Sequence, residues 1–316
     1  MYSGTGYAST AVPDAETIIS KLATSCPICG HEGARIPVVH LRDWDIVRCT
    51  SCLAESVSNL PLPELLREAY QSFDAGEIVR GNFRAYSTKA VSVLRNELAE
   101  CGLGCLSGID KPSFFDYGCG GGHFLWAAKT LGFEVMGMEL DAASVEFGRA
   151  HGLDVRLASL PANLAMVEGK KFDLIKSMHV LEHVPEPLST LRALHGLMKP
   201  GGIMILSVPD QASFPSLVKK ALRVFGVKRA DWGFVQPPIH LHGYRYRTLQ
   251  RVGEVLGLNV VSIRKTSPLD GTVFPTTPDY WKGLQVHRLV YVAGRILGSG
   301  GHFTAIYRQG SSLYAA

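Results

Sequence analysis

Beyond residue 113, short apolar segments alternate with helical ones, and this alternation constrains the fold more than any other feature. Strands are expected at residues 114–117, 134–139, 154–157, 172–177, 203–208, 260–264 and 303–308. Helices are expected at residues 123–131, 142–151, 187–198, 216–224, 246–256 and 280–296. Strands that alternate with crossover helices form parallel sheets, so we predict an α/β protein with a mostly parallel seven-stranded sheet and helices on both faces.

A glycine-rich segment lies between the first of these strands and the helix that follows it, and it reads Asp-Tyr-Gly-Cys-Gly-Gly-Gly at residues 116–122. Gly118 and Gly120 can adopt a positive φ, and their lack of a side chain lets the backbone approach a ligand closely. The next strand ends at Glu139, where a carboxylate can accept hydrogen bonds from both ribose hydroxyls of an adenosine. Because dinucleotide-binding enzymes place an acid similarly, this spacing alone leaves the cofactor class open.

Three segments in the same order resemble motifs of the class I S-adenosylmethionine-dependent methyltransferases. They are the glycine-rich loop at 116–122, the Phe-Asp-Leu-Ile of 172–175 followed by His-Val-Leu-Glu-His-Val at 179–184, and the Leu-Met-Lys-Pro-Gly-Gly of 197–202. The resemblance covers residues 113–209, and the second motif is similar to the subgroup with ubiquinone-biosynthesis O-methyltransferases and methyltransferases of sugar and natural-product pathways. It implies a Rossmann-like sheet.

This resemblance implies a site for S-adenosylmethionine, with S-adenosylhomocysteine as the product. In the family, the glycine loop surrounds the methionine part of the cofactor, the acid after the second strand holds the ribose, and the next residue lies against the adenine. An acidic residue often follows the third strand, where this chain has a serine instead. The residues expected to contact the cofactor are Asp116, Gly118, Cys119, Gly120, Glu139, Leu140, Ser159 and His179.

The acceptor chemistry points to a histidine near the same sheet edge. The methyl group on a sulfonium is electrophilic, so the enzyme mainly positions the acceptor in line with it. A hydroxyl acceptor benefits from a base whose pKa lies near neutrality, which histidine provides. His183 follows the fourth strand, where ligands bind in open α/β sheets, and we expect it to be this base. The alternative is a structural histidine whose ring bonds a backbone group.

A second group of candidate residues lies at 237–245. If this segment is extended, alternation places His240, His242 and Tyr244 on one side. The segment resembles a His-Leu-His-aromatic stretch that related sugar and natural-product methyltransferases place near the acceptor, which implies that these residues orient or deprotonate a hydroxyl. The alternative is a polar connection that packs against the last helix. His240 and His242 could also bind a metal, but the neighbouring sequence offers no third ligand.

Four of the seven cysteines form two Cys-x-x-Cys pairs, at Cys26 and Cys29 and at Cys49 and Cys52. Two such pairs suit a tetrahedral structural Zn²⁺ site, with unpaired or redox cysteines as the alternative. The odd total fits a reducing compartment better than a secreted disulfide framework, and we expect a cytoplasmic protein. The apolar segment 289–297 is too short to span a membrane and is interrupted by Arg295.

These features divide the chain into four parts. The parts are a flexible N-terminus at 1–24, a zinc-ribbon-like module at 25–62, a helical lid or linker at 63–108, and a methyltransferase domain at 109–316 with acceptor-site insertions around 210–250 and 266–300. The sequence leaves the oligomeric state open, a homodimer included.

We therefore expect an enzyme that methylates a small molecule, at a hydroxyl oxygen of a sugar or secondary metabolite. Transfer to carbon or nitrogen of a nucleotide-linked sugar is one alternative, and an RNA methyltransferase with a zinc module is another. The formal net charge of +4 does not demand a nucleic acid. The basic residues that favour RNA are Lys219, Lys220, Arg223, Lys228, Arg229, Arg245 and Arg247.

Overall fold

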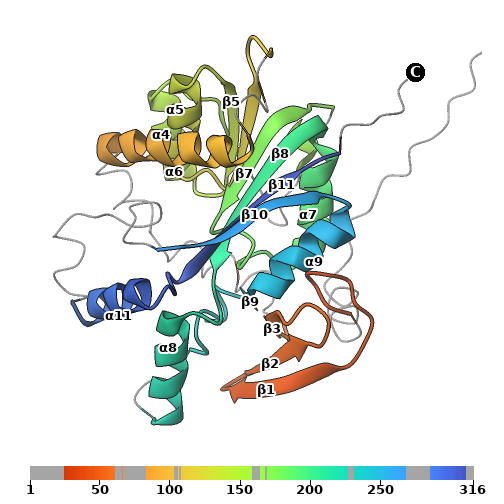
Figure 1. The fold of residues 1–316 in the computed structure, drawn as a ribbon, viewed down its shortest axis with the longest axis vertical. Coiled ribbons are helices and arrows are strands. Elements are labelled where there is room, and N and C mark those ends of the chain that lie inside the picture. The colour runs from red at the N-terminus through yellow and green to blue at the C-terminus, as the bar shows by residue number, and fades with distance from the viewer. Residues whose placement is uncertain are drawn as a thin grey trace, which may run out of the picture.

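The protein, described here from a computed structural model, is built around a seven-stranded sheet (Figure 1). The strand order is β10-β11-β8-β7-β4-β5-β6. The strands are β4 (Ser113–Tyr117), β5 (Glu134–Glu139), β6 (Val155–Leu157), β7 (Phe172–Met178), β8 (Met198–Pro209), β10 (Asn259–Thr266) and β11 (His302–Arg308). The structure describes residues 25–60, 66, 83–102, 106, 108–158, 164–167, 169–226, 231–267 and 285–310.

Strand β11 runs antiparallel to both of its neighbours, β8 and β10, whereas the pairs from β8 to β6 are parallel. The predicted mostly parallel seven-stranded sheet is therefore confirmed. The largest difference from the expected strand bounds is at β8, which begins at Met198 and takes in the Pro-Gly-Gly of residues 200–202. Phe172 pairs with Met198 and Leu174 with Ile203, so the turn forms a bulge in which Gly201 has a φ of 75°.

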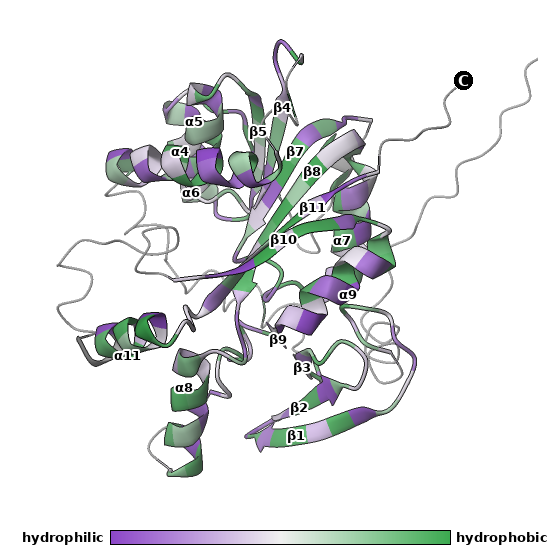
Figure 2. Ribbon diagram, viewed as in Figure 1, coloured by the Kyte–Doolittle hydropathy of each residue, from purple (hydrophilic) through white to green (hydrophobic). Residues whose placement is uncertain are grey.

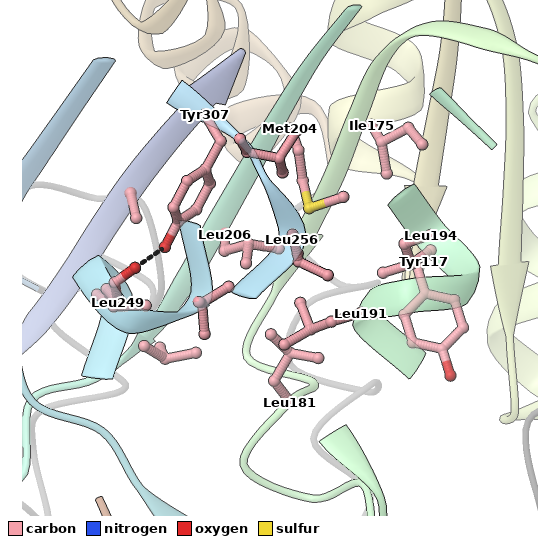
Figure 3. Packing of buried hydrophobic residues seen from close by; sticks show 14 of the residues in the cluster. Tyr117, Ile175, Leu181, Leu191, Leu194, Met204, Leu206, Leu249, Leu256 and Tyr307 are labelled. Atoms are coloured by element: carbon pink, nitrogen blue, oxygen red, sulfur yellow. Dashed lines mark hydrogen bonds between the residues drawn. The ribbon is translucent and has the colours of Figure 1, made fainter. Parts of the chain in front are cut away.

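Helices cover both faces of the sheet (Figure 1). One face carries α4 (Phe83–Glu100), α5 (His123–Thr130) and α6 (Ala142–Ala150), and the other carries α7 (Pro187–Gly196) and α9 (Tyr246–Leu256). Figure 2 shows hydrophobic residues along the central strands. In Figure 3, leucines of α7 and α9 pack against Met204 and Leu206, and the Tyr307 hydroxyl donates to the Leu249 carbonyl oxygen at 2.9 Å.

A second, four-stranded sheet has the order β1-β2-β3-β9 and is antiparallel throughout. Its strands are β1 (Arg35–Leu41), β2 (Trp44–Cys49), β3 (Glu55–Val57) and β9 (His242–Gly243). Strand β9 comes from the acceptor-site insertion expected around 210–250. The four-cysteine module expected at 25–62, called the cysteine module below, therefore shares one sheet with the methyltransferase domain. The sequence division at residue 62 missed this pairing because strand partners far apart in the chain leave no local pattern.

Three further elements complete the described chain: η1 (Leu164–Val167), α8 (Phe214–Val224) and α11 (Gln285–Ile296). Helices α8 and α11 pack against each other. Of the helical lid or linker expected at 63–108, the structure describes α4. Most of 61–82 lies outside the described residues, as do the N-terminal residues 1–24. Within the described ranges, no helix combines the length and apolar character that crossing a membrane requires.

Candidate active site

The glycine loop lies where the chain order of the sheet reverses. From β4 the chain continues through β5 and β6 on one side, and β7 and β8 lie on the other. Loops after β4 and β7 therefore meet at the carboxyl ends of two adjacent strands, the position at which open α/β sheets bind ligands. Gly118 and Gly120 have φ values of 76° and 52°, so both take the left-handed conformation expected of them.

The two loop glycines differ in their surroundings. A Cβ on Gly118 would overlap the side chain of Val180, which shows that the loops after β4 and β7 are in direct contact. A Cβ on Gly120 would meet no described atom within 4 Å, so this side of the loop is open. The buried Cys119 thiol lies between the two glycines. The loop thus pairs one tightly packed glycine with one that a ligand can approach.

Glu139 connects the glycine loop to the start of the next helix. Its carboxylate accepts hydrogen bonds from the backbone N–H of Gly120 at 2.7 Å, of Leu140 at 2.6 Å and of Asp141 at 3.0 Å. Asp141 in turn caps α6 by accepting from the backbone N–H of Ala143 and Ser144. The half-buried Glu139 is therefore held beside the open glycine, as a ribose-binding acid requires. Ser159 lies outside the described residues.

Asp116 is a buried carboxyl at the end of β4. Burial raises its pKa to about 7, with Lys176 on β7 acting in the opposite direction and Glu139 on β5 and Glu97 on α4 adding to the increase. Lys176 is itself buried and bonds to both carboxylate oxygens of Glu97, at 3.0 and 2.8 Å. Asp116 therefore changes charge close to neutral pH, next to the loop that is expected to receive a cationic cofactor.

Cofactor affinity should accordingly depend on pH. If only ionised Asp116 favours the sulfonium cofactor, binding in the folded protein weakens as pH falls through about 7, because a proton must leave Asp116 first. The affinity should rise by about eightfold between about pH 6 and about pH 7.5, a range below the pKa of the cofactor's own amine. Calorimetric titration of wild type and Asp116→Asn measures this. An equal pH dependence in both proteins would contradict it.

Helix α4 covers the start of α5, directly after the glycine loop. The His123 ring lies 4.9 Å from the Phe83 ring and 5.4 Å from the Tyr86 ring, measured between centroids. Ser87 contributes a hydroxyl 3.3 Å from His123 Nδ1. Part of the segment expected as a lid or linker thus packs against the start of α5, directly after the glycine loop.

Four side chains gather in the segment after β7 and in the loop before β9. His179 has a φ of 55°, a conformation rarely adopted by a residue with a side chain. Its Nδ1 lies 3.1 Å from Glu182 Oε1, so the ring donates to the carboxylate. The His183 and His240 rings meet edge to face at 4.5 Å between centroids. Burial lowers the pKa of His183, and it lowers the pKa of His240 to about 4, so both rings are neutral at pH 7. We name His179, Glu182, His183 and His240 the imidazole cluster.

His242 and Tyr244 take a different place from the one expected. Both are 0% exposed. The His242 ring nitrogens lie 3.0 Å from Ser56 Oγ and 3.0 Å from the Val184 carbonyl oxygen, and the Tyr244 hydroxyl donates to the Leu181 carbonyl oxygen at 3.0 Å. The alternation argument was sound, since both residues face the same segment as His240. Their polar atoms bond protein groups, and these bonds hold the loop around β9 against the segment after β7. Contact of either residue with an acceptor stays a prediction.

One member of the imidazole cluster and one of its neighbours had no predicted role. Glu182 was visible in the motif, but nothing in the sequence showed that its side chain would be 1% exposed among three histidines. His302, at the start of β11, is buried and lies 4.7 Å from the His179 ring. His302 reaches this position because β11 lies between β10 and β8 in the sheet. Only that strand order brings residue 302 beside residue 179.

The four cysteines converge as expected from their spacing. The distance from Cys26 Sγ to Cys52 Sγ is 3.7 Å and from Cys29 Sγ to Cys49 Sγ is 3.8 Å, and all four sulfurs lie within 4.8 Å of one another. A tetrahedral Zn²⁺ with bonds of about 2.3 Å requires sulfurs about 3.8 Å apart. The thiols are buried and none is in a disulfide. This geometry fits a four-thiolate zinc ion.

A buried carboxylate joins the cysteine module to the rest of the chain. Glu55, 0% exposed on β3, accepts hydrogen bonds from five side chains. The donors are Arg48, Gln211, Lys220, Trp232 and Arg245, at distances between 2.7 and 3.1 Å. Two residues of the basic group considered for RNA binding, Lys220 and Arg245, are thus used to neutralise Glu55.

Other members of that basic group are also engaged within the protein. Arg223 donates to the His40 carbonyl oxygen at 3.0 Å, and Arg247 pairs with Glu254 at 3.2 Å. Lys228 and Arg229 lie outside the described residues. Lys220, Arg223, Arg245 and Arg247 therefore all make contacts within the fold.

The sheet and the glycine loop at its switch point form a Rossmann-like α/β fold. Residues 90–263, more than half of the chain, match the family described as Methyltransferase domain. The chain therefore belongs to this family, and the resemblance to class I S-adenosylmethionine-dependent methyltransferases is confirmed.

Similar curated proteins carry one recurring name. The ubiquinone biosynthesis O-methyltransferase of Ruegeria pomeroyi is 40% identical over 108 residues, which are 32% of this chain and 44% of that protein. That of Bordetella avium is 36% identical over 123 residues, 37% of this chain and 50% of that protein. The chain thus spans half or less of these relatives. A solved S-adenosylmethionine-dependent methyltransferase from Archaeoglobus fulgidus has a TM-score of 0.48 at 20% identity and covers 75% of this chain and 100% of that one.

Proposed function

We propose that this protein transfers the methyl group of S-adenosylmethionine to a hydroxyl oxygen of a small molecule, a sugar or secondary-metabolite intermediate. The observation that carries the proposal is the placement of two groups at one switch point. The glycine loop with Glu139 lies after β4 and β5, and the imidazole cluster lies after β7, with Gly118 and Val180 in contact between them. The O-methyltransferase name of the matched relatives supports the choice of oxygen.

The proton of the acceptor hydroxyl would be removed at the imidazole cluster, and His183 is the candidate base. Its Nδ1 lies 3.1 Å from the Ile239 carbonyl oxygen, which can only accept, so the ring proton is on Nδ1. The neutral ring then carries its lone pair on Nε2, as a base requires. Removing the proton would make the oxygen a better nucleophile for the electrophilic methyl group.

The cysteine module would hold a structural Zn²⁺ ion. Four thiolates close the coordination sphere, so the ion would have no free position for an acceptor. The support is the sulfur spacing together with the backbone hydrogen bond from Leu188 N–H, at the start of α7, to the Pro27 carbonyl oxygen at 2.9 Å. The ion would thereby brace the helix that follows the imidazole cluster. Reduced thiolates persist in the cytoplasm, which is our proposed location.

The test is transfer of label from S-adenosylmethionine into a cell extract that is separated into low-mass and RNA fractions. We expect label in the low-mass fraction, because the described basic residues serve contacts within the fold. Label confined to RNA would contradict the small-molecule acceptor. A low-mass product would then be analysed by mass spectrometry to find which atom carries the methyl group.

The variant Glu139→Ala tests whether Glu139 binds the cofactor. Hydrogen bonds to a charged group contribute about 1.5–3 kcal/mol, so cofactor affinity should fall by roughly 10- to 100-fold. Calorimetry with S-adenosylhomocysteine measures this directly. The control is Glu134→Ala, an exposed glutamate at the other end of β5, which should bind like wild type. Native affinity in Glu139→Ala would remove the ribose-binding role from this residue.

A further inference from the structure

We propose that Glu182, His183 and His240 bind a divalent metal ion that holds the acceptor's hydroxyl oxygen for methylation. The inference rests on the proposed function and concerns how its acceptor is activated. The three side chains each offer one ligand atom, and these atoms lie within 4.8 Å of one another. The sequence offered His240 and His242 as ligands without a third, whereas the fold places Glu182 and His183, from the segment after β7, beside His240.

The two histidines are oriented as metal ligands usually are. His183 Nδ1 lies 3.1 Å from the Ile239 carbonyl oxygen, and His240 Nδ1 lies 3.0 Å from the Phe234 carbonyl oxygen. Metal-binding histidines commonly donate one ring N–H to such a carbonyl, which fixes the tautomer and directs the other nitrogen to the ion. Here the same pattern occurs twice, in rings that are in edge-to-face contact.

Glu182 provides an independent observation. Its side chain is 1% exposed, and its Oε1 accepts from His179. The other carboxylate oxygen, Oε2, is buried and has no hydrogen-bond partner in the described chain. A buried carboxylate oxygen without a partner is costly, because nothing replaces the water it has lost. A cation at the ligand set of Glu182, His183 and His240 satisfies this oxygen.

Two imidazoles and one carboxylate suit a divalent transition metal, and three protein ligands leave positions open for a substrate. The acceptor's hydroxyl oxygen takes one of these positions, and the ion lowers the pKa of that hydroxyl. The hydroxyl proton leaves to water. The oxygen lone pair forms the new O–CH₃ bond while the S–CH₃ bond breaks and its electron pair stays on sulfur. His183 then acts as a ligand of the ion, and the free-base role applies only to a protein without it.

Binding of Mn²⁺ to the full-length protein, followed by electron paramagnetic resonance, tests the site itself. Mn²⁺ prefers nitrogen and oxygen ligands, so the thiolate cluster does not compete for it. We expect one Mn²⁺ per chain in wild type, and affinity at least about tenfold weaker in Glu182→Gln and in His240→Ala. Because Glu182 is buried and Glu182→Gln could misfold, half-buried His240 gives the second variant. The control is His40→Ala, at an exposed histidine of β1.

The outcomes separate this inference from the proposed function. Absence of saturable Mn²⁺ binding, or equal binding by wild type and both variants, would overturn the metal site. Full methyl transfer by chelator-treated protein that retains its thiolate-bound zinc would also overturn it, and would leave His183 as a free base with the proposed function intact. Mn²⁺ binding that depends on Glu182 and His240, without methyl transfer in any extract fraction, would contradict the proposed function and leave the metal site standing.

Discussion

Replacing Glu55 with alanine is expected to lower the free energy of unfolding by about 3–5 kcal/mol, because removing one partner of a buried ion pair leaves the other charges uncompensated. Burial alone would raise the pKa of Glu55, but Lys220 and the hydrogen bonds from Gln211, Arg48 and Arg245 outweigh it and hold the pKa at about 2. The carboxylate is therefore ionised at neutral pH. Its contribution is present above the unfolded-state pKa and is lost as pH falls toward 2.

Urea unfolding of the full chain measures this effect. Glu55→Gln keeps the size but not the charge of the side chain, and it should fall between wild type and Glu55→Ala. The control is Glu254→Ala on α9, which removes a carboxylate paired with Arg247 and Arg251 at the surface. Exposed pairs are screened by solvent, so little change is expected. Equal unfolding curves for Glu55→Ala and Glu254→Ala would show that Glu55 does not join the two parts of the fold.

Replacing Cys49 with serine is expected to prevent binding of the proposed zinc ion and to destabilise the protein by several kcal/mol, since binding of a structural zinc ion contributes directly to folding. The cysteine cluster packs in the same core as leucines of α7 and α9, and Thr248 of α9 donates to the Cys52 carbonyl oxygen at 2.9 Å. Loss of the ion should therefore loosen the helices beside the imidazole cluster. Metal analysis of freshly purified protein and thermal unfolding measure both effects.

Cys101→Ser is the matched control, because Cys101 is also buried but lies apart from the four-cysteine cluster at the end of α4. It should retain about one zinc ion per chain. Wild-type protein that contains no zinc and shows four reactive thiols in this cluster would rule out the zinc site. In that case the short sulfur distances would reflect packing of protonated thiols alone.

Local patterns in the sequence were sufficient for the sheet and its cofactor loop. Apolar strands separated by amphipathic helices have only a few compatible topologies, and glycines at 118 and 120 are required where the backbone turns through positive φ. The spacing of Cys26, Cys29, Cys49 and Cys52 likewise predicted their convergence, because each Cys-x-x-Cys pair is a local turn that presents two sulfurs together.

The imidazole cluster and the Glu55 contacts were decided by tertiary structure. His183 and His240 lie 57 positions apart, and Glu55 and Arg245 lie 190 apart. Their approach depends on β9 pairing with β3 and on the loop before β9 folding over the segment after β7. Burial also separated His240, beside Glu182 and His183, from His242 and Tyr244, whose polar atoms are used internally. Residue type and alternation show which side chains share a face, whereas long-range packing decides what that face meets.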